Sequence, residues 1–311
     1  MTRRITVTDI QQLKERGERI SMLTAYDFPS ARIADEAGIH ILLVGDSVGM
    51  VVLGYESTLP VTVDDMIHHG RPVVRASKRA HVVIDLPFGS YQRGWQQAME
   101  SAVRIMQETG AGAVKLEGGM RSADTVDKLV QAGIPVMGHV GLTPQSVNTL
   151  GGFKIQGKTP RDSVRVLQDA KALEDAGAYA VVLESVPAAV AASITDKLTI
   201  PTIGIGAGPY CSGQVQVWQD LLGIDEHFKP RHAKHYLKGA TLIRDAVARY
   251  REEVESGAFP SAAESFYLDE RAMRRIEYLR SRHQVEPQNE AADTALVMYE
   301  AEHEQGSGEG S

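Results

Sequence analysis

The residue types best suited to chemistry in this chain stand at the ends of short apolar runs that have the character of buried strands. These residues are Asp46, Ser47, Asp85, Lys115, Glu117, His139 and Glu184. If the runs form neighbouring parallel strands, their carboxyl ends meet at one face, which is where β/α barrels carry their active sites. The sequence therefore predicts a single polar site assembled from several strand ends.

Asp46, Asp85 and Glu117 are the predicted ligands of a divalent metal ion. Carboxylates clustered beside buried strands are costly unless a cation neutralises them. Hard oxygen ligands with no partner cysteines favour Mg²⁺, although other divalent ions that accept carboxylate and water fit as well. Each acid alone could instead cap a helix or lie in a solvated loop, but three acids on consecutive strand ends favour the metal.

Lys115 and Glu117 are two residues apart, so both side chains point to the same side of their strand. Lys115 could bind a substrate anion, form a Schiff base, or bridge to a neighbouring acid and only stabilise the barrel. His139 could be a ligand, a hydrogen-bond donor to substrate, or a satisfied strand-end histidine. These alternatives stay open at the level of residue types.

Glu184 follows a later run and is expected across the barrel ring from the metal ligands. A partly desolvated carboxylate there could remove a proton from a carbon next to a carbonyl group, or act as a fourth ligand or ion-pair partner. The glycine-rich segment 204–208 offers backbone N–H groups for phosphate, which is weak evidence alone. Cys211 has no base placed beside it by the sequence, so a nucleophilic role is disfavoured.

The elements that must position these residues are eight apolar runs separated by segments with helical periodicity. The runs cover residues 20–23, 39–45, 81–86, 111–118, 134–141, 178–185, 200–208 and 213–218. Most are continuously apolar, as expected of parallel strands buried on both faces. Eight β/α units predict a (β/α)8 barrel rather than an open sheet with a glycine-rich turn after its first strand. A short helix over 8–15 is expected to cap the N-terminal end of the barrel.

The C-terminal part of the chain differs from the rest in composition. No Lys or Arg follows Arg282, whereas seven acids do, and residues 1–282 carry 33 acids and 33 bases. We predict a catalytic barrel over 1–266 and a helical, acidic extension over 267–311 that ends in a disordered tail, with helices over 268–282 and 290–304. The balanced barrel, without a Lys/Arg-rich stripe, argues against nucleic acid as a partner.

The single cysteine, Cys211, excludes an internal disulfide framework and a cysteine-based zinc cluster. The N-terminal residues lack the apolar core of a signal peptide, and no stretch of 18 uncharged apolar residues follows. We therefore expect a cytoplasmic protein with no membrane partner.

Six motifs in order resemble the ketopantoate hydroxymethyltransferase family from about residue 5 to 266. They are TAYD (24–27), VGDSVGMVVLGYESTLPVTVDDM (44–66), VKLEGG (114–119), GHVGLTPQSVNTLGGFKIQGKT (138–159), VLESVP (182–187) and GIGAGPYCSGQVQVWQDLLG (204–223). The resemblance implies a barrel of the phosphoenolpyruvate/pyruvate type, Mg²⁺, and a large homo-oligomer, commonly a decamer. It also implies the first committed step of pantothenate biosynthesis: hydroxymethyl transfer from 5,10-methylenetetrahydrofolate to 3-methyl-2-oxobutanoate through a Mg-stabilised enolate, giving 2-dehydropantoate and tetrahydrofolate.

The resemblance also assigns roles to residues. Asp46, Asp85 and Glu117 would hold the ion directly or through water, Ser47 and Lys115 would hold the substrate carboxylate, and Glu184 would be the general base. The expected substrate-contacting residues are Asp46, Ser47, Asp85, Lys115 and His139.

Two departures from the family pattern stand out. Ser212 occupies a position where the family usually has Asp, which puts in doubt any loop or folate-side contact of that acid, and the tail exceeds the short C-terminus common in the family. The alternatives to this function are another Mg-dependent 2-oxo acid lyase or mutase of the same barrel superfamily, a class I aldolase that uses Lys115, and a non-catalytic barrel scaffold.

Overall fold

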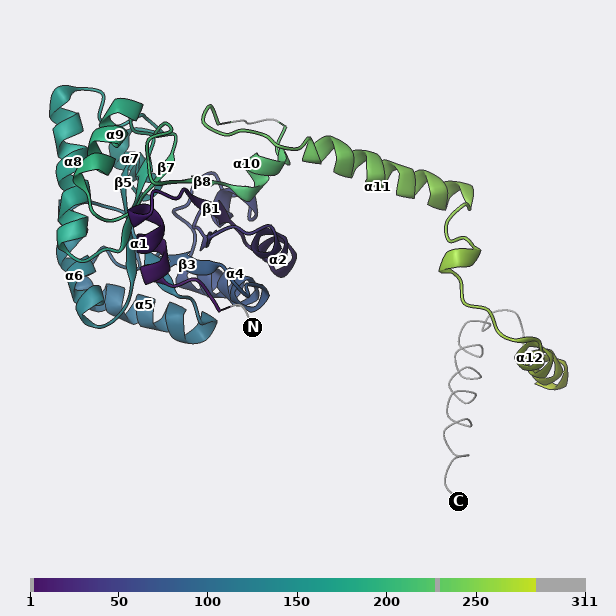
Figure 1. The fold of residues 1–311 in the computed structure, drawn as a ribbon. Coiled ribbons are helices and arrows are strands. Elements are labelled where there is room, and N and C mark those ends of the chain that lie inside the picture. Colours follow the sequence, from purple (N-terminus) through teal and green to yellow (C-terminus); the bar gives the residue numbers. More distant parts are fainter. Residues whose placement is uncertain (1–2, 227–229, 284–311) are drawn as a thin grey trace, which may run out of the picture. The chain divides into compact units, whose positions relative to one another are not determined.

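Eight parallel strands close into a barrel in the computed structural model, which describes residues 3–226 and 230–283 (Figure 1). Each strand pairs with the next along the chain, and β8 pairs with β1 to close the ring. The strands are β1 (Ile20–Thr24), β2 (Ile41–Val44), β3 (His81–Asp85), β4 (Ala113–Lys115), β5 (Val136–Gly141), β6 (Ala180–Glu184), β7 (Thr202–Ile205) and β8 (Gly213–Gln216). Seven of them fall within the apolar runs and β1 extends one residue beyond its run, to Thr24, so the predicted (β/α)8 barrel is confirmed.

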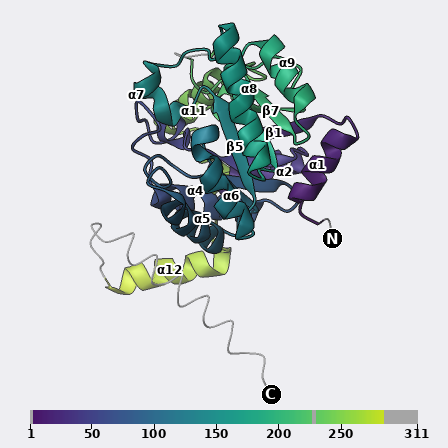
Figure 2. The ribbon, with the colours of Figure 1, turned by 90° about the vertical axis from the view of Figure 1, so that its left-hand side faces the viewer.

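Helices cover the outside of the barrel, as the two perpendicular views of Figures 1 and 2 show. The longer ones are α2 (Phe28–Glu36), α4 (Val63–Ala76), α5 (Trp95–Thr109), α6 (Ala123–Gln131), α8 (Pro160–Asp175) and α9 (Ala188–Lys197). Short helices interrupt the loops: α3 (Val48–Val51), η1 (Met120–Ser122), η2 (Pro144–Ser146), α7 (Val147–Leu150) and α10 (Trp218–Leu222). Residues 206–212, between β7 and β8, form no helix, so the expectation of eight complete β/α repeats is wrong at this one connection.

Local sequence signals explain where these helices begin and end. The hydroxyl of Thr159 accepts a hydrogen bond from the Asp162 N–H at the start of α8, and Pro160 occupies the first turn, where its missing N–H costs nothing. Helix α5 ends at Gly110, whose φ of +76° is the left-handed conformation that glycine adopts without a Cβ clash.

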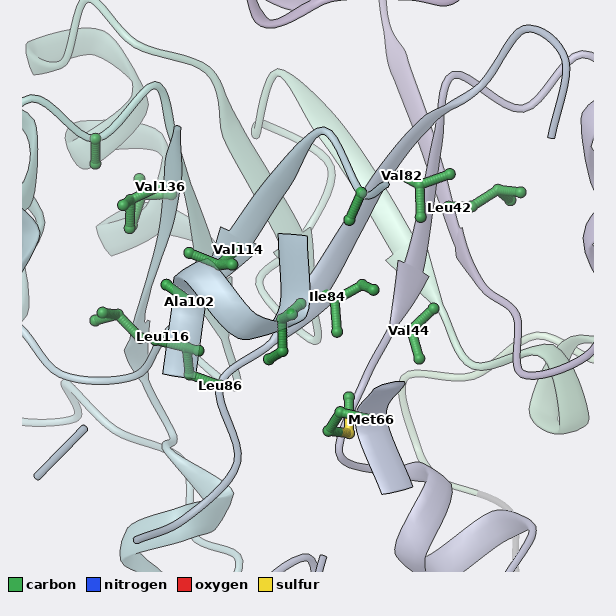
Figure 3. Close-up of a cluster of buried hydrophobic side chains, with 14 of the residues drawn as sticks. Leu42, Val44, Met66, Val82, Ile84, Leu86, Ala102, Val114, Leu116 and Val136 are labelled. Atoms are coloured by element: carbon green, nitrogen blue, oxygen red, sulfur yellow. The ribbon is translucent and has the colours of Figure 1, made fainter. Parts of the chain in front are cut away.

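Side chains along each strand alternate between the barrel interior and the layer beneath the helices. The interior cluster includes Met22, Ile41, Leu43, Val83, Ala113, Met137 and Val182. The outer cluster, part of which Figure 3 shows, includes Leu42, Val44, Val82, Ile84 and Val114 from the strands with Met66 from α4 and Ala102 from α5. Both faces of the strands are buried, which is why the runs are apolar without interruption.

The N-terminal helix α1 (Val7–Glu15) matches the helix predicted over 8–15. Its buried side chains Ile10 and Leu13 join the interior cluster with Ile20 at the start of β1. Because Ile20 lies at the N-terminal end of its strand, α1 closes the end of the barrel opposite the strand C-termini. The capping role predicted for this helix is therefore confirmed.

The chain divides into two compact units, residues 1–242 and 243–311. The second contains most of α11 (Gly239–Ser256), then η3 (Ala262–Glu264) and α12 (Glu270–His283), which matches the helix predicted over 268–282. The helix predicted over 290–304 lies outside the described residues, and the division at residue 266 stays a prediction. Among the described helices, none has the length and apolarity needed to cross a bilayer.

Candidate active site

The alternation that builds the interior core also places the polar residues of the site. Asp85 has the same inward orientation as Val83 two residues earlier on β3, and Lys115 has that of Ala113 on β4. His139 follows Met137 on β5, and Glu184 follows Val182 on β6, in the same way. These side chains therefore form the layer above the apolar interior, at the C-terminal end of the barrel.

Lys115 and Asp85 form a buried ion pair at the centre of this layer. The Lys115 Nζ atom lies 2.7 Å from Asp85 Oδ1, and the two side chains are only 5% and 3% exposed. The other Asp85 oxygen accepts a hydrogen bond from the backbone N–H of Asp46 at 3.1 Å. Burial opposes the charge on Lys115, but the nearby carboxylates Asp85, Glu117 and Asp46 outweigh it and raise the lysine pKa.

Asp46 and Glu117 are buried as well, so neither is a solvated loop acid. Burial, followed by repulsion from Asp85 and Glu117, holds the pKa of Asp46 well above its usual range. Asp46 Oδ2 accepts a hydrogen bond from Gln145 Nε2, whereas Glu117 Oε2 accepts one from the backbone N–H of Gln145 in the first turn of η2. In the described part of the chain Asp46 caps no helix, so its burial favours a ligand role over the helix-cap alternative. Glu117 binds a helix N–H with Oε2 and keeps Oε1 for another partner.

His139 lies between two carboxylates. Its Nδ1 atom is 3.4 Å from Glu117 Oε1, and its Nε2 atom is 3.2 Å from Glu184 Oε2, although neither nitrogen makes a well-aligned hydrogen bond. Burial and the Lys115 charge oppose protonation, but Glu117 and Glu184 outweigh them and raise the pKa of His139. Glu184 was expected across the ring from the predicted ligands. Because β5 is the only strand between β4 and β6, the imidazole of His139 on β5 contacts Glu117 on one side and Glu184 on the other.

Glu184 is the most exposed carboxylate of the group, with 18% of its side chain accessible. The next residue, Ser185, is the only non-glycine residue in the described part of the chain with a positive φ, at 49°. Such strained backbone persists where the surrounding structure fixes it, commonly at functional sites. Here the Ser185 N–H donates to Ile205 O, and its carbonyl accepts from the Gln156 N–H, so hydrogen bonds hold the turn on both sides.

Ser47 lies beside this cluster, and its Oγ atom is 2.8 Å from the Tyr26 hydroxyl. Gly45 permits this approach, because a Cβ there would lie 3.0 Å from Ser47 Oγ and 3.4 Å from Asp85 Oδ2. The predicted site residues are therefore all brought together.

Sequence reasoning missed three residues that contact this site: Tyr26, Tyr91 and Gln145. Tyr26 and Gln145 lie inside family-like motifs, and that position was their only signal in the sequence. Tyr91 lies in none of the motifs.

The donor chemistry fits a divalent ion. Three carboxylates are buried around one lysine, and the raised pKa of Asp46 shows that its negative charge is poorly compensated by the protein alone, as expected at a site that binds a cation. Within residues 3–226 and 230–283, no three His, Cys, Asp or Glu side chains form a preassembled metal cage. Mg²⁺ needs no such cage, because it is commonly held by one or two carboxylates together with waters and substrate oxygens.

The segment after β7 separates into two parts with different positions. Residues 206–210 follow the strand C-terminus, whereas Ser212 lies back at the start of β7, where its N–H donates to Thr202 Oγ1 at 3.1 Å. Ser212 is thus at the barrel end away from the site, so a folate-side role for an acid at this position has no geometric basis. Cys211 is buried, burial raises its pKa, and its sulfur packs against Gly204, which agrees with a structural role.

Comparisons with known proteins agree with this geometry. A family model described as ketopantoate hydroxymethyltransferase matches residues 4–262. A 3-methyl-2-oxobutanoate hydroxymethyltransferase of Chloroflexus aurantiacus is 58% identical over 266 residues, covering 86% of this chain and 94% of the relative. Another from Carboxydothermus hydrogenoformans is 54% identical over 273 residues, covering 88% of this chain and 99% of the relative.

Solved structures with much lower identity share the fold. A phosphonopyruvate hydrolase in complex with oxalate and Mg²⁺ has a TM-score of 0.57 at 12% identity, over 90% of this chain and 100% of that one. A 2,3-dimethylmalate lyase, a member of the PEP mutase/isocitrate lyase superfamily, has a TM-score of 0.51 at 17% identity, over 90% and 97% of the two chains. On the family model and the close relatives together, the chain belongs to the ketopantoate hydroxymethyltransferase family.

Proposed function

We propose that this protein transfers a hydroxymethyl group from 5,10-methylenetetrahydrofolate to 3-methyl-2-oxobutanoate, giving 2-dehydropantoate and tetrahydrofolate, in the cytoplasm and at the first step of pantothenate biosynthesis. Family membership supports the reaction. The observation that carries it is the buried carboxylate cluster around Lys115, connected through His139 to the more accessible Glu184.

Asp46, Asp85 and Glu117 would hold Mg²⁺, directly or through water. When bound, the ion would supply positive charge that polarises the 2-oxo acid and stabilises the enolate. The barrel shields the three predicted ligands from bulk water, since each of them is at least 95% buried. Low solvent access strengthens each electrostatic interaction with a small anionic substrate.

Lys115 would bind the substrate carboxylate, together with Ser47. The raised pKa keeps its ammonium group protonated, and a protonated amine cannot attack a carbonyl carbon. The ion pair with Asp85 therefore supports electrostatic binding over the Schiff-base mechanism of a class I aldolase. His139, whose ring nitrogens lack well-aligned partners, retains donor capacity for a substrate oxygen.

Glu184 would remove the C3 proton. Its carboxylate is more accessible than the three predicted ligands, so it is the acid of this group that can approach a carbon atom of bound substrate. The contact with His139 would orient the carboxylate. A positioned base of this kind contributes about 10²- to 10⁴-fold to the rate.

Deuterium exchange at C3 of 3-methyl-2-oxobutanoate tests this step without folate. We expect Mg²⁺-dependent exchange with the wild type, detected by NMR in D2O, and a loss of about 10²- to 10⁴-fold in Glu184→Gln with metal binding retained. Glu36→Gln, which changes an exposed carboxylate on α2, is the matched control. Loss of the metal from Glu184→Gln would make Glu184 a ligand instead of the base.

Two further assays separate the alternatives. Borohydride trapping of a covalent adduct at Lys115 would support the class I aldolase and contradict this mechanism. Exchange without folate-dependent formation of 2-dehydropantoate would support a lyase or mutase, and the absence of both would support a scaffold.

We propose a large homo-oligomer, as in the decamers of the family. Helix α11 supports this, because Ile243, Val247, Tyr250 and Val254 recur on one helical face and are each 45% to 61% exposed in the single chain. An exposed apolar stripe of this kind fits burial against another copy. Light scattering of the purified chain gives the mass directly, and a monomer would contradict the proposal.

A further inference from the structure

Gln145 is a buried, uncharged residue with a central place in the carboxylate cluster. It lies in η2, in the loop after β5, and only 5% of it is exposed. Its side-chain Nε2 donates to Asp46 Oδ2 and to the Leu86 carbonyl, both at 2.9 Å. Its backbone N–H donates to Glu117 Oε2 at 3.0 Å. One residue thus fixes an oxygen of each of two predicted metal ligands.

The orientation of the amide follows from its partners. The Leu86 carbonyl can only accept a hydrogen bond, so it requires the NH2 group of the amide on the side that also faces Asp46. On the other side, Gln145 Oε1 accepts from the Tyr91 hydroxyl at 2.7 Å and from Gln92 Nε2 at 3.1 Å. Both donors and both acceptor positions of the amide are therefore used, and a flipped amide would face an acceptor with its oxygen.

Tyr91 extends this network to the backbone of Glu117. Its hydroxyl accepts from the Glu117 N–H at 3.1 Å and donates to Gln145 Oε1. The loop after β3, which carries Tyr91 and Gln92, thereby holds the amide against Asp46. The side chain and backbone N–H of Gln145 together connect the loops that follow β2, β3, β4 and β5.

The two anchored carboxylates keep their remaining oxygens for other partners. In the described part of the chain, Gln145 Nε2 is the one hydrogen-bond donor to the Asp46 carboxylate, and Oδ1 is left open. Glu117 Oε2 is occupied by the Gln145 N–H, whereas Oε1 faces His139. The distance between the two acids is consequently set by a residue that carries no charge and adds none to the site.

We infer that Gln145 is a positioning residue for the divalent ion: its side-chain amide orients the carboxylate of Asp46, and its backbone N–H orients that of Glu117. This inference rests on the proposed function, because it presumes a metal at these acids. Residues that orient metal ligands through hydrogen bonds commonly contribute 10- to 100-fold to metal affinity. The effect is expected on ion binding itself, before any substrate is present.

Titration of the substrate-free protein with Mn²⁺, followed by electron paramagnetic resonance of the free ion, measures this affinity. Gln145→Met keeps the side-chain length and the backbone N–H on Glu117 but removes the amide that holds Asp46. We expect its dissociation constant for Mn²⁺ to rise about 10- to 100-fold. Tyr91→Phe removes the hydroxyl that orients the amide, and we expect a smaller rise in the same direction.

Ser122→Ala is the matched control, because the Ser122 hydroxyl donates to the Glu117 carbonyl and touches neither carboxylate. It removes one buried hydrogen bond near the same acid, so we expect a smaller loss of unfolding free energy in urea than in Gln145→Met, with an unchanged dissociation constant for Mn²⁺.

Three outcomes overturn the inference in distinguishable ways. If the wild type binds no Mn²⁺, the proposed metal function fails and this inference fails with it. If the wild type binds and Gln145→Met binds equally well, only the positioning role fails. If Gln145→Met does not fold, an unchanged dissociation constant in Tyr91→Phe overturns the role.

Discussion

Replacing Lys115 by Met tests whether the carboxylate cluster depends on its buried cation. Lys115 and Asp85 are 2.7 Å apart with side chains only 5% and 3% exposed. Removing one partner of such a pair leaves the other charge buried and uncompensated, which costs about 3 to 5 kcal/mol of unfolding free energy. Asp46 and Glu117 lie in the same buried cluster, so the variant also loses the charge that offsets their mutual repulsion.

Urea unfolding at a fixed protein concentration, with EDTA present, measures this loss. The unfolding free energy of Lys115→Met should be about 3 to 5 kcal/mol lower than that of the wild type. The unfolding free energy of Lys171→Met, which removes an exposed lysine on α8, should stay close to that of the wild type. Added Mg²⁺ should stabilise Lys115→Met more than the wild type, because the variant's site carries one more uncompensated negative charge.

The companion variant Lys115→Met/Asp85→Asn removes both charges of the pair. If the cost in Lys115→Met is an uncompensated carboxylate, the double variant should be more stable than the sum of the two single losses predicts, by about 1 kcal/mol or more. A loss below about 1 kcal/mol in Lys115→Met, or strict additivity in the double variant, would refute the electrostatic account.

Two further predictions concern the fold. Burial lowers the pKa of His81 to about 4 from an ordinary value near 6.5. Between these two pH values His81 is protonated in the unfolded chain but not in the folded state, so unfolding takes up a proton. Between pH 7 and 4.5 the wild type should therefore lose about 2 to 3 kcal/mol more unfolding free energy than His81→Gln; parallel pH dependences in urea would contradict this. Gly141→Ala places a Cβ 2.3 Å from Glu184 O at a φ of +92°, whereas Gly133→Ala has a similar φ of +85° and open space. We expect Gly141→Ala to lose about 2 to 4 kcal/mol of unfolding free energy and Gly133→Ala to lose clearly less. Equal midpoints of the two variants in thermal unfolding would show that the overlap at residue 141 is relieved.

Asp85, Lys115, His139 and Glu184 could be placed from the sequence because strand periodicity determines their inward orientation. Once a run such as 81–85 is identified as a parallel strand, the period of two puts Asp85 on the same side as Val83, inside the barrel. The order of the strands then makes Asp85 and Lys115 neighbours. Sequence reasoning placed Glu184 by its strand alone and did not foresee that His139, on the strand between, contacts both Glu184 and Glu117. Asp46 has the parity of the outward-facing Leu42 and Val44, so its position in the site depends on the turn after β2.

Ser212 shows why the connection after β7 was harder to interpret. The glycine-rich motif suggested one loop at the active-site face, but with no helix between β7 and β8 the chain must return along the height of the barrel within residues 206–212. Residues 204–212 therefore begin at the C-terminal end of the barrel strands and finish at their N-terminal end. Hydrogen bonds between Ser212 and Thr202 identify the far end, and only the strand register reveals this.

Gln145 could not be identified from the sequence for a different physical reason. A carboxylate next to an apolar strand is conspicuous because its burial is costly, whereas a glutamine in a loop is ordinary until its partners are known. Its four side-chain hydrogen bonds go to residues 46, 86, 91 and 92, which are distant along the chain and close only after the barrel has closed. Charged residues that continue the inward face of a strand can thus be predicted from strand periodicity, whereas a neutral residue that positions them is recognised by its satisfied hydrogen bonds in the folded structure.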